Sequence, residues 1–149
     1  MQVFLDFVAE QWMLFAAFIV LSSLLIRSWV LPGLSGIKNV GVTDAVRMLN
    51  DDEALVLDVR LEKEYLAAHI KGSRHIPVGA IAARVSEISK FRDKPVLVTC
   101  QTGNRSTHAA QILKKQGFEN VTNLSGGLNA WMSANMPVSS GKEKKKKSA

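Results

Sequence analysis

Short apolar runs alternate with helix-like segments through the middle of the chain. Residues 54–59 (ALVLDV) and 95–100 (PVLVTC) are almost uniformly apolar and rich in β-branched side chains, a pattern typical of strands buried on both faces. Weaker runs at residues 121–124 and 73–76 predict two further strands. Because strands and helices alternate, we expect an α/β domain with a largely parallel sheet.

Four helices are predicted around these strands. Thr43 is expected to cap a first helix that continues through DAVRMLN, because threonine is a favoured N-cap residue. The other three are expected at residues 62–68, 81–88 and 106–116. Gly117 is expected to end the last of them, since glycine commonly follows a helix C-terminus.

The N-terminal segment has a different pattern. Residues 12–31 read WMLFAAFIVLSSLLIRSWVL, with Arg27 as the one charged residue. About twenty helical residues span roughly 30 Å, the thickness of the hydrocarbon core of a bilayer. The segment therefore predicts one transmembrane helix. Lysine and arginine follow it (Lys38, Arg47) and none precedes it, so the positive-inside rule predicts a single-pass inner (cytoplasmic) membrane protein with a short N-terminus outside and a cytoplasmic domain.

Two other interpretations of this segment fit less well. A secretory signal peptide needs a positive N-terminal region, whereas MQVFLDFVAE carries two acids and no base, and no A-x-A cleavage pattern follows. A buried core helix that is apolar on all sides needs a larger domain around it. The organisation that we expect is an N-terminal segment over residues 1–31, a linker over 32–41, a catalytic domain over 42–138 and a polybasic tail over 139–149.

The net charge of the chain is distributed unevenly among these segments, and this distribution decides which partners it indicates. The chain of 149 residues carries a formal charge of +6. Residues 1–31 contribute −1 and residues 142–147 (KEKKKK) contribute +4, which leaves +3 for the rest. No basic stripe with interleaved aromatic residues is present, so nucleic-acid binding is not expected. The tail is expected either to remain solvated or to bind membrane lipid of the anionic cytoplasmic leaflet.

Cys100 is the only cysteine, which excludes an internal disulfide, a zinc ribbon and a C-x-x-C redox pair. It ends the predicted strand at residues 95–100, and a helix is expected to begin near Ser106. Such a strand-to-helix loop directs backbone amides inward, so it can bind an anion and favour the thiolate. Phosphatases with a cysteine nucleophile carry C-x5-R, whereas Cys100 and Arg105 give C-x4-R. The tighter loop better fits one extra sulfur atom on the cysteine.

Three segments in order resemble the single-domain rhodanese family, over roughly residues 41–138. They are LVLDVRLEKEYLAAHIKGSRHIP, CQTGNRS and LSGGLNAWMSANMPV. The second resembles the active-site loop of the family, and the third resembles its C-terminal Gly-Gly-x-x-x-Trp helix. Ala68 departs from the glycine that the family often has before its histidine. The resemblance implies a parallel five-stranded sheet flanked by helices, here preceded by the predicted transmembrane helix.

The resemblance also implies roles for particular residues. Cys100 would be the catalytic nucleophile that accepts a sulfane sulfur as a persulfide. Asp58 and Arg60 would shape the rim of the pocket. The residues expected to bind the substrate around the cysteine are Gln101, Thr102, Gly103, Asn104, Arg105 and Ser106. His69 is expected to be structural. No metal site and no cofactor are expected, since no histidine, cysteine and carboxylate positions share a metal-like spacing.

The predicted function is a rhodanese-type sulfurtransferase anchored to the membrane. It would move sulfur from thiosulfate, another small anionic sulfur donor or a protein persulfide to a thiol or protein acceptor through a persulfide on Cys100. The main alternative is a rhodanese-like interaction module that recruits partner proteins at the membrane. A phosphatase or arsenate reductase is less favoured because of the loop length.

Overall fold

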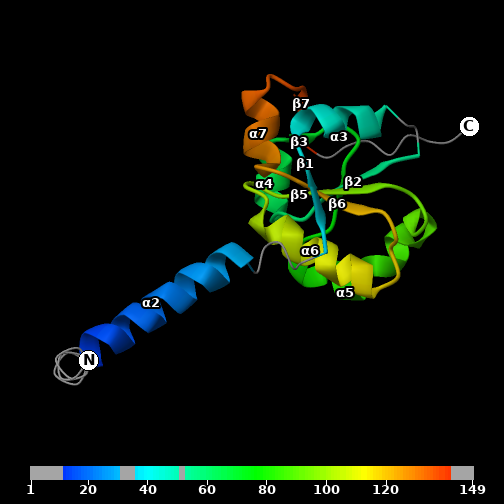
Figure 1. Cartoon of the computed structure of the whole chain (residues 1–149). Coiled ribbons are helices and arrows are strands. Elements are labelled where there is room, and N and C mark those ends of the chain that lie inside the picture. The colour runs from blue at the N-terminus through cyan, green and yellow to red at the C-terminus, as the bar shows by residue number, and fades with distance from the viewer. Residues whose placement is uncertain (1–11, 31–35, 51–52, 142–149) are drawn as a thin grey trace, which may run out of the picture. The chain divides into compact units, whose positions relative to one another are not determined.

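The computed structural model describes residues 12–30, 36–50 and 53–141. The chain divides into two compact units, one over Met1–Gly36 and the other over Ile37–Ala149. Within the first unit the structure describes a single helix, α2 (Trp12–Val30) (Figure 1). The second unit is the α/β domain, which holds all the residues predicted to form the site.

Helix α2 lies where an apolar helix was predicted, and large side chains such as Trp12, Phe18 and Leu25 are exposed. Nevertheless, none of the helices in the described ranges has the length and apolar character needed to cross a membrane. The structure therefore does not support the predicted transmembrane helix. The polybasic segment at residues 142–149 lies outside the described residues.

A five-stranded sheet organises the second unit. Its strand order is β1-β6-β5-β2-β4, and all four neighbouring pairs are parallel. These strands are β1 (Lys38–Val40), β2 (Leu55–Asp58), β4 (Arg74–His75), β5 (Val96–Thr99) and β6 (Val121–Leu124). Strands β2 and β5 lie at the centre, and every residue in both is buried. The expected parallel five-stranded sheet is confirmed.

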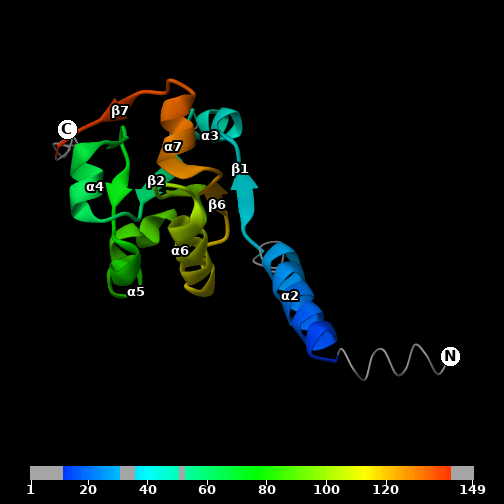
Figure 2. The same cartoon turned by 90° about the vertical axis from the view of Figure 1, so that its left-hand side faces the viewer.

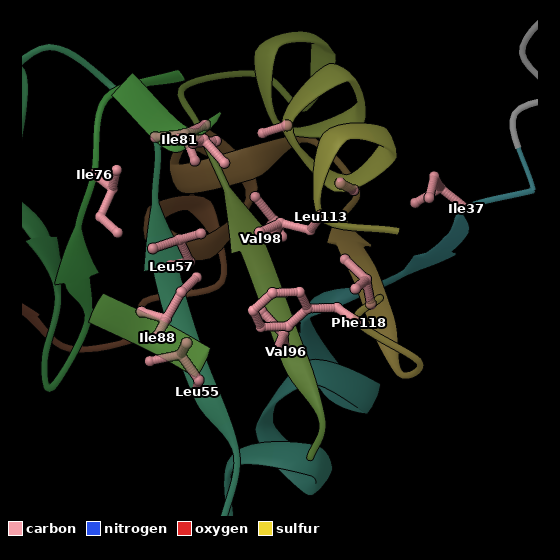
Figure 3. Packing of buried hydrophobic residues seen from close by; sticks show 14 of the residues in the cluster. Ile37, Leu55, Leu57, Ile76, Ile81, Ile88, Val96, Val98, Leu113 and Phe118 are labelled. Atoms are coloured by element: carbon pink, nitrogen blue, oxygen red, sulfur yellow. The ribbon is translucent and has the colours of Figure 1, made fainter. Parts of the chain in front are cut away.

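Helices cover both faces of this sheet, as the two views of the domain show (Figures 1 and 2). The helices are α3 (Val42–Leu49), α4 (Glu62–Ala67), α5 (Ile81–Arg84), α6 (Asn104–Lys115) and α7 (Gly127–Ser133), with 3₁₀ turns η2 (Val78–Ala80) and η3 (Val85–Phe91). On one face, Leu57 and Val98 of the central strands pack with Leu113 of α6 and with Phe118 (Figure 3). On the other face, residues of α3 and α7 pack against the sheet, Trp131 among them.

Several boundaries differ from the sequence predictions. Residues 38–40, expected in the linker, form the edge strand β1, which the pattern does not reveal because two of its three residues are exposed. Helix α3 begins at Val42, so its N-cap is Gly41 rather than Thr43. The helix expected at residues 81–88 is α-helical only through Arg84 and continues as the 3₁₀ turn η3.

Two further differences concern the site and a short pairing. Helix α6 begins at Asn104 rather than near Ser106, so Asn104 and Arg105 form its first turn. Strand β3 (His69–Ile70) pairs with β7 (Val138–Ser139) in a separate antiparallel ribbon. The two residues of β3 and of β7 carry too little periodicity to reveal a strand, whereas the two-residue strand β4 lies within the run predicted at residues 73–76.

Candidate active site

Cys100 follows β5 directly and lies at the carboxyl edge of the sheet, where α/β proteins generally bind ligands. Its side chain is almost fully buried, with 1% of the residue exposed. The Gly103 amide donates a hydrogen bond to Cys100 Sγ over 3.1 Å, and Ser106 Oγ lies 3.3 Å from the same sulfur. The loop therefore wraps closely around the thiol.

These contacts change the acidity of the thiol. Burial of Cys100 tends to raise its pKa, because a buried charge loses its hydration. Hydrogen bonds from the Ser106 hydroxyl and from the amides of Ser106, Thr102 and Gly103 outweigh burial and lower the pKa below its ordinary value. The thiolate is the nucleophilic form of cysteine, so the loop prepares Cys100 to attack.

Gly103 makes the tight loop possible. Its φ of +103° is a conformation that side chains with a Cβ rarely adopt, and the residue is the N-cap of α6. Its carbonyl oxygen accepts hydrogen bonds from Ser106 Oγ at 3.0 Å and from Thr107 Oγ1 at 2.9 Å. The Ser106 hydroxyl has one hydrogen, so it can donate either to this carbonyl or to Cys100 Sγ.

Asp58 and Arg60, expected at the rim of the pocket, are both buried. They form an ion pair of 2.6 Å in which both side chains are buried. Arg60 also donates to the Ala68 carbonyl at 2.6 Å and to Gln101 Oε1 at 3.1 Å. Arg60 thus holds the Gln101 side chain by a hydrogen bond, which is a structural role that the sequence interpretation did not assign to it.

The N-terminus of α7 holds the other side of the loop. The Leu128 amide donates to the Cys100 carbonyl at 2.8 Å, and the Asn129 amide donates to the Gln101 carbonyl at 3.2 Å. Gly127 has a φ of +56°, and a Cβ at this position would lie 2.7 Å from the Gln101 carbonyl carbon. Gly127, the first residue of α7, is therefore required for the helix to approach the loop, which its motif alone did not explain.

Arg105 is held by Glu64, a residue that the sequence interpretation did not assign to the site. Two hydrogen bonds, of 2.9 and 2.8 Å, join the Arg105 guanidinium to the Glu64 carboxylate. The hydrogen bond from Arg105 is the main cause that lowers the pKa of Glu64 to about 2, and the Leu61 amide contributes as well. Forty-one residues separate the partners, so only the fold could reveal this pair.

The remaining predicted residues differ in exposure. Thr102 and Asn104 have exposed side chains. His69 is fully buried, with Nδ1 2.8 Å from the Tyr65 carbonyl oxygen and its ring stacked on Tyr65. Within residues 12–30, 36–50 and 53–141, no group of three or more histidine, cysteine or carboxylate side chains could hold a metal ion.

An activated cysteine inside a ring of backbone amides at the edge of a parallel sheet defines a protein suited to covalent transfer through a thiolate. Residues 42–134 match the rhodanese-like domain family. The chain therefore belongs to the rhodanese-like family, as the sequence motifs indicated.

Relatives include both characterised and uncharacterised proteins. The putative sulfur carrier protein YrkF of Bacillus subtilis is 37% identical over 98 residues, which cover 65% of this chain and only 52% of that relative. The uncharacterized protein YibN of Escherichia coli is 32% identical over 95% of this chain and 100% of its own length. The thiosulfate sulfurtransferase GlpE of Vibrio cholerae is 36% identical over 67% of this chain and 92% of its own length.

Solved structures agree on the fold. A rhodanese-related protein from Thermoplasma volcanium superposes with a TM-score of 0.61 at 29% identity, covering 68% of this chain and 97% of that structure. The described fold and the family match thus point to the same class, and sulfur transfer is an activity found within it.

Proposed function

We propose that this protein is a sulfurtransferase that carries sulfane sulfur as a persulfide on Cys100. The observation that carries the proposal is the hydrogen bonding of Cys100 Sγ by the Gly103 amide and Ser106 Oγ inside a buried loop. Such donors stabilise a thiolate, and after transfer they can stabilise the negative charge of a persulfide. Named relatives include thiosulfate sulfurtransferases.

The reaction consists of two displacements. Cys100 thiolate attacks the outer sulfur of a donor, so a bond forms between Sγ and that sulfur while the donor's own bond to it breaks. The donor leaves as sulfite or as a thiolate, and no net oxidation occurs. An acceptor thiolate then attacks the outer sulfur of the Cys100 persulfide and regenerates the Cys100 thiolate.

Intact mass spectrometry tests this function directly. The full chain is incubated with thiosulfate or with cysteine persulfide, and we expect one added sulfur atom that cyanide removes. Cys100→Ser is the control, because it removes the only thiol in the sequence. If neither donor adds sulfur, or if the serine variant gains the same mass, the proposal is wrong.

The same variant separates an enzyme from an interaction module. A scaffold that recruits partner proteins needs no nucleophile, so Cys100→Ser would retain its cellular function. A sulfurtransferase would lose that function, since covalent catalysis depends on the thiolate. Complementation of a deletion strain with Cys100→Ser therefore decides between them.

We also propose that the N-terminal segment associates the protein with the cytoplasmic membrane and that the α/β domain lies in the cytoplasm. Support comes from the uncharged sequence at residues 12–26 and from the positions of Lys38 and Arg47 after it. Membrane fractionation followed by alkaline extraction measures the attachment, and a deletion of residues 1–35 is the control. Recovery of the full chain entirely in the soluble fraction would contradict this proposal.

A further inference from the structure

The cationic groups beside the thiol are already neutralised by carboxylates. Arg60 is paired with Asp58 in the interior, and Arg105 is paired with Glu64 near the surface. The exposed side chains of the loop, Thr102 and Asn104, are uncharged. Arg105 lies near Cys100 and Arg60 contacts Gln101 of the loop, and each of these two arginines is paired with one carboxylate.

The pair between Arg105 and Glu64 is placed to affect an incoming donor. The main cause that raises the pKa of Arg105 is its hydrogen bond with Glu64, and the charge of the Cys100 thiolate raises it further. The Arg105 guanidinium therefore interacts electrostatically with the Cys100 sulfur. Its side chain is 38% exposed, compared with 2% for Arg60. Arg105 is therefore the one of these two arginines that a donor in solution can reach.

Glu64 is firmly held in this position. Its carboxylate accepts hydrogen bonds from both terminal nitrogens of Arg105, at 2.9 and 2.8 Å, and from the Leu61 amide, at 2.9 Å. A bidentate pair uses the geometry by which arginine otherwise binds an oxyanion. A dianionic donor would have to displace the carboxylate of Glu64 and would meet its negative charge beside the thiolate.

We propose that Glu64 sets donor specificity by cancelling the charge of Arg105, so that Cys100 takes sulfur from persulfides of thiols in preference to dianions such as thiosulfate. This inference rests on the proposed sulfurtransferase function and names its substrate class. In the favoured step the Cys100 thiolate attacks the outer sulfur of R–S–SH. The new bond joins Sγ to that sulfur, the donor S–S bond breaks, R–S⁻ leaves, and the persulfide proton stays with the transferred sulfur.

The test compares kcat/KM for thiosulfate and for cysteine persulfide, which carries a smaller negative charge, with transfer of sulfur to cyanide as the assay. We expect the wild-type chain to favour cysteine persulfide. Glu64→Gln leaves Arg105 unneutralised, and we expect the ratio of the two kcat/KM values to shift about tenfold toward thiosulfate, mainly through a lower KM. High salt should reduce this shift, because it screens exposed charges.

Glu62→Gln is the matched control, since it removes the same charge from an exposed position on the same helix. We expect it to shift the ratio by less than about twofold. If Glu64→Gln does not fold, as judged by circular dichroism, Thr102→Lys adds a cation to the loop and leaves the pair intact. It too should shift the ratio toward thiosulfate.

Two results would overturn the inference. One is a wild-type chain that uses thiosulfate at least as efficiently as cysteine persulfide. The other is a Glu64→Gln variant that lowers kcat for both donors equally, because Glu64 would then only position Arg105. Failure of the proposed function is a different result: no donor would load Cys100 in any variant.

Discussion

Ser106 shows how one hydroxyl group can tune the reactive residue. Its Oγ lies 3.3 Å from Cys100 Sγ and is fully buried. Water therefore cannot readily replace it when the thiolate forms. A hydrogen bond to a charged group contributes about 1.5–3 kcal/mol, more than one between neutral groups.

Ser106→Ala is expected to raise the pKa of Cys100, because it removes the hydroxyl hydrogen bond that favours the thiolate. The rate of alkylation of the full chain by iodoacetamide, measured against pH, reports this pKa. Ser89→Ala is the control, because Ser89 Oγ donates to the Ser86 carbonyl instead. An unchanged profile in Ser106→Ala would show that the backbone amides alone stabilise the thiolate.

At the scale of elements, the N-termini of two helices, α6 and α7, hold the loop that carries Cys100. Helix α6 begins after Gly103 and supplies the Ser106 hydroxyl. Helix α7 begins at Gly127, and its first amides bind the carbonyls of Cys100 and Gln101. The position of the thiol therefore depends on close backbone contact between α7 and the loop.

Gly127→Ala is expected to destabilise the full chain by about 2–4 kcal/mol, because a left-handed conformation and overpacking each add a cost. The new Cβ would overlap the backbone of Cys100 and Gln101, so sulfur loading should fall as well. Urea denaturation and intact mass measure the two effects.

Gly117→Ala is the matched control for this prediction. Gly117 also has a positive φ, +86°, but a Cβ there would meet nothing within 4 Å. Gly117→Ala should lower the free energy of unfolding by about 1–2 kcal/mol through the backbone conformation alone, and sulfur loading of Cys100 should stay unchanged. Equal losses in both variants would mean that contact with the loop is unimportant.

At the scale of the whole molecule, an ion pair and a hydrogen bond join segments that are far apart in sequence. Glu64 of α4 binds Arg105 of α6, and Arg60 after β2 binds Gln101 after β5. The first pair is partly exposed and the second arginine is buried with Asp58. The contributions of these contacts to the free energy of unfolding should therefore differ in size.

Asp58→Asn is expected to lower the free energy of unfolding by about 3–5 kcal/mol, since it leaves Arg60 buried without a counter-charge. The control is Asp44→Asn, because Asp44 and Arg47 form an exposed pair at 3.6 Å that should contribute less than about 1 kcal/mol. Urea denaturation of the full chain measures both. A loss below 1 kcal/mol for Asp58→Asn would contradict the prediction.

The pair between Glu64 and Arg105 predicts a loss of stability in acid. Because the pKa of Glu64 is about 2 in the folded chain against an ordinary 4.5, the unfolded chain binds more protons between these values, and stability falls as pH decreases. At neutral pH, the free energy of unfolding of the wild-type chain should exceed that of Glu64→Gln by about 1–2 kcal/mol. This difference should shrink between pH 4.5 and pH 2. A difference that does not depend on pH would contradict the assignment.

The sequence by itself determined the central strands, the class of fold and the place of Cys100 directly after a strand. Runs such as ALVLDV and PVLVTC specify buried strands because apolar burial is a local property of composition, and a single cysteine between a strand and a helix already indicates its chemistry. Only the tertiary structure decided that Glu64 neutralises Arg105, that Arg60 donates to Gln101 and that Gly127 meets the backbone of the loop. Each of these is a contact between distant segments, and sequence spacing carries no information about which distant polar groups meet.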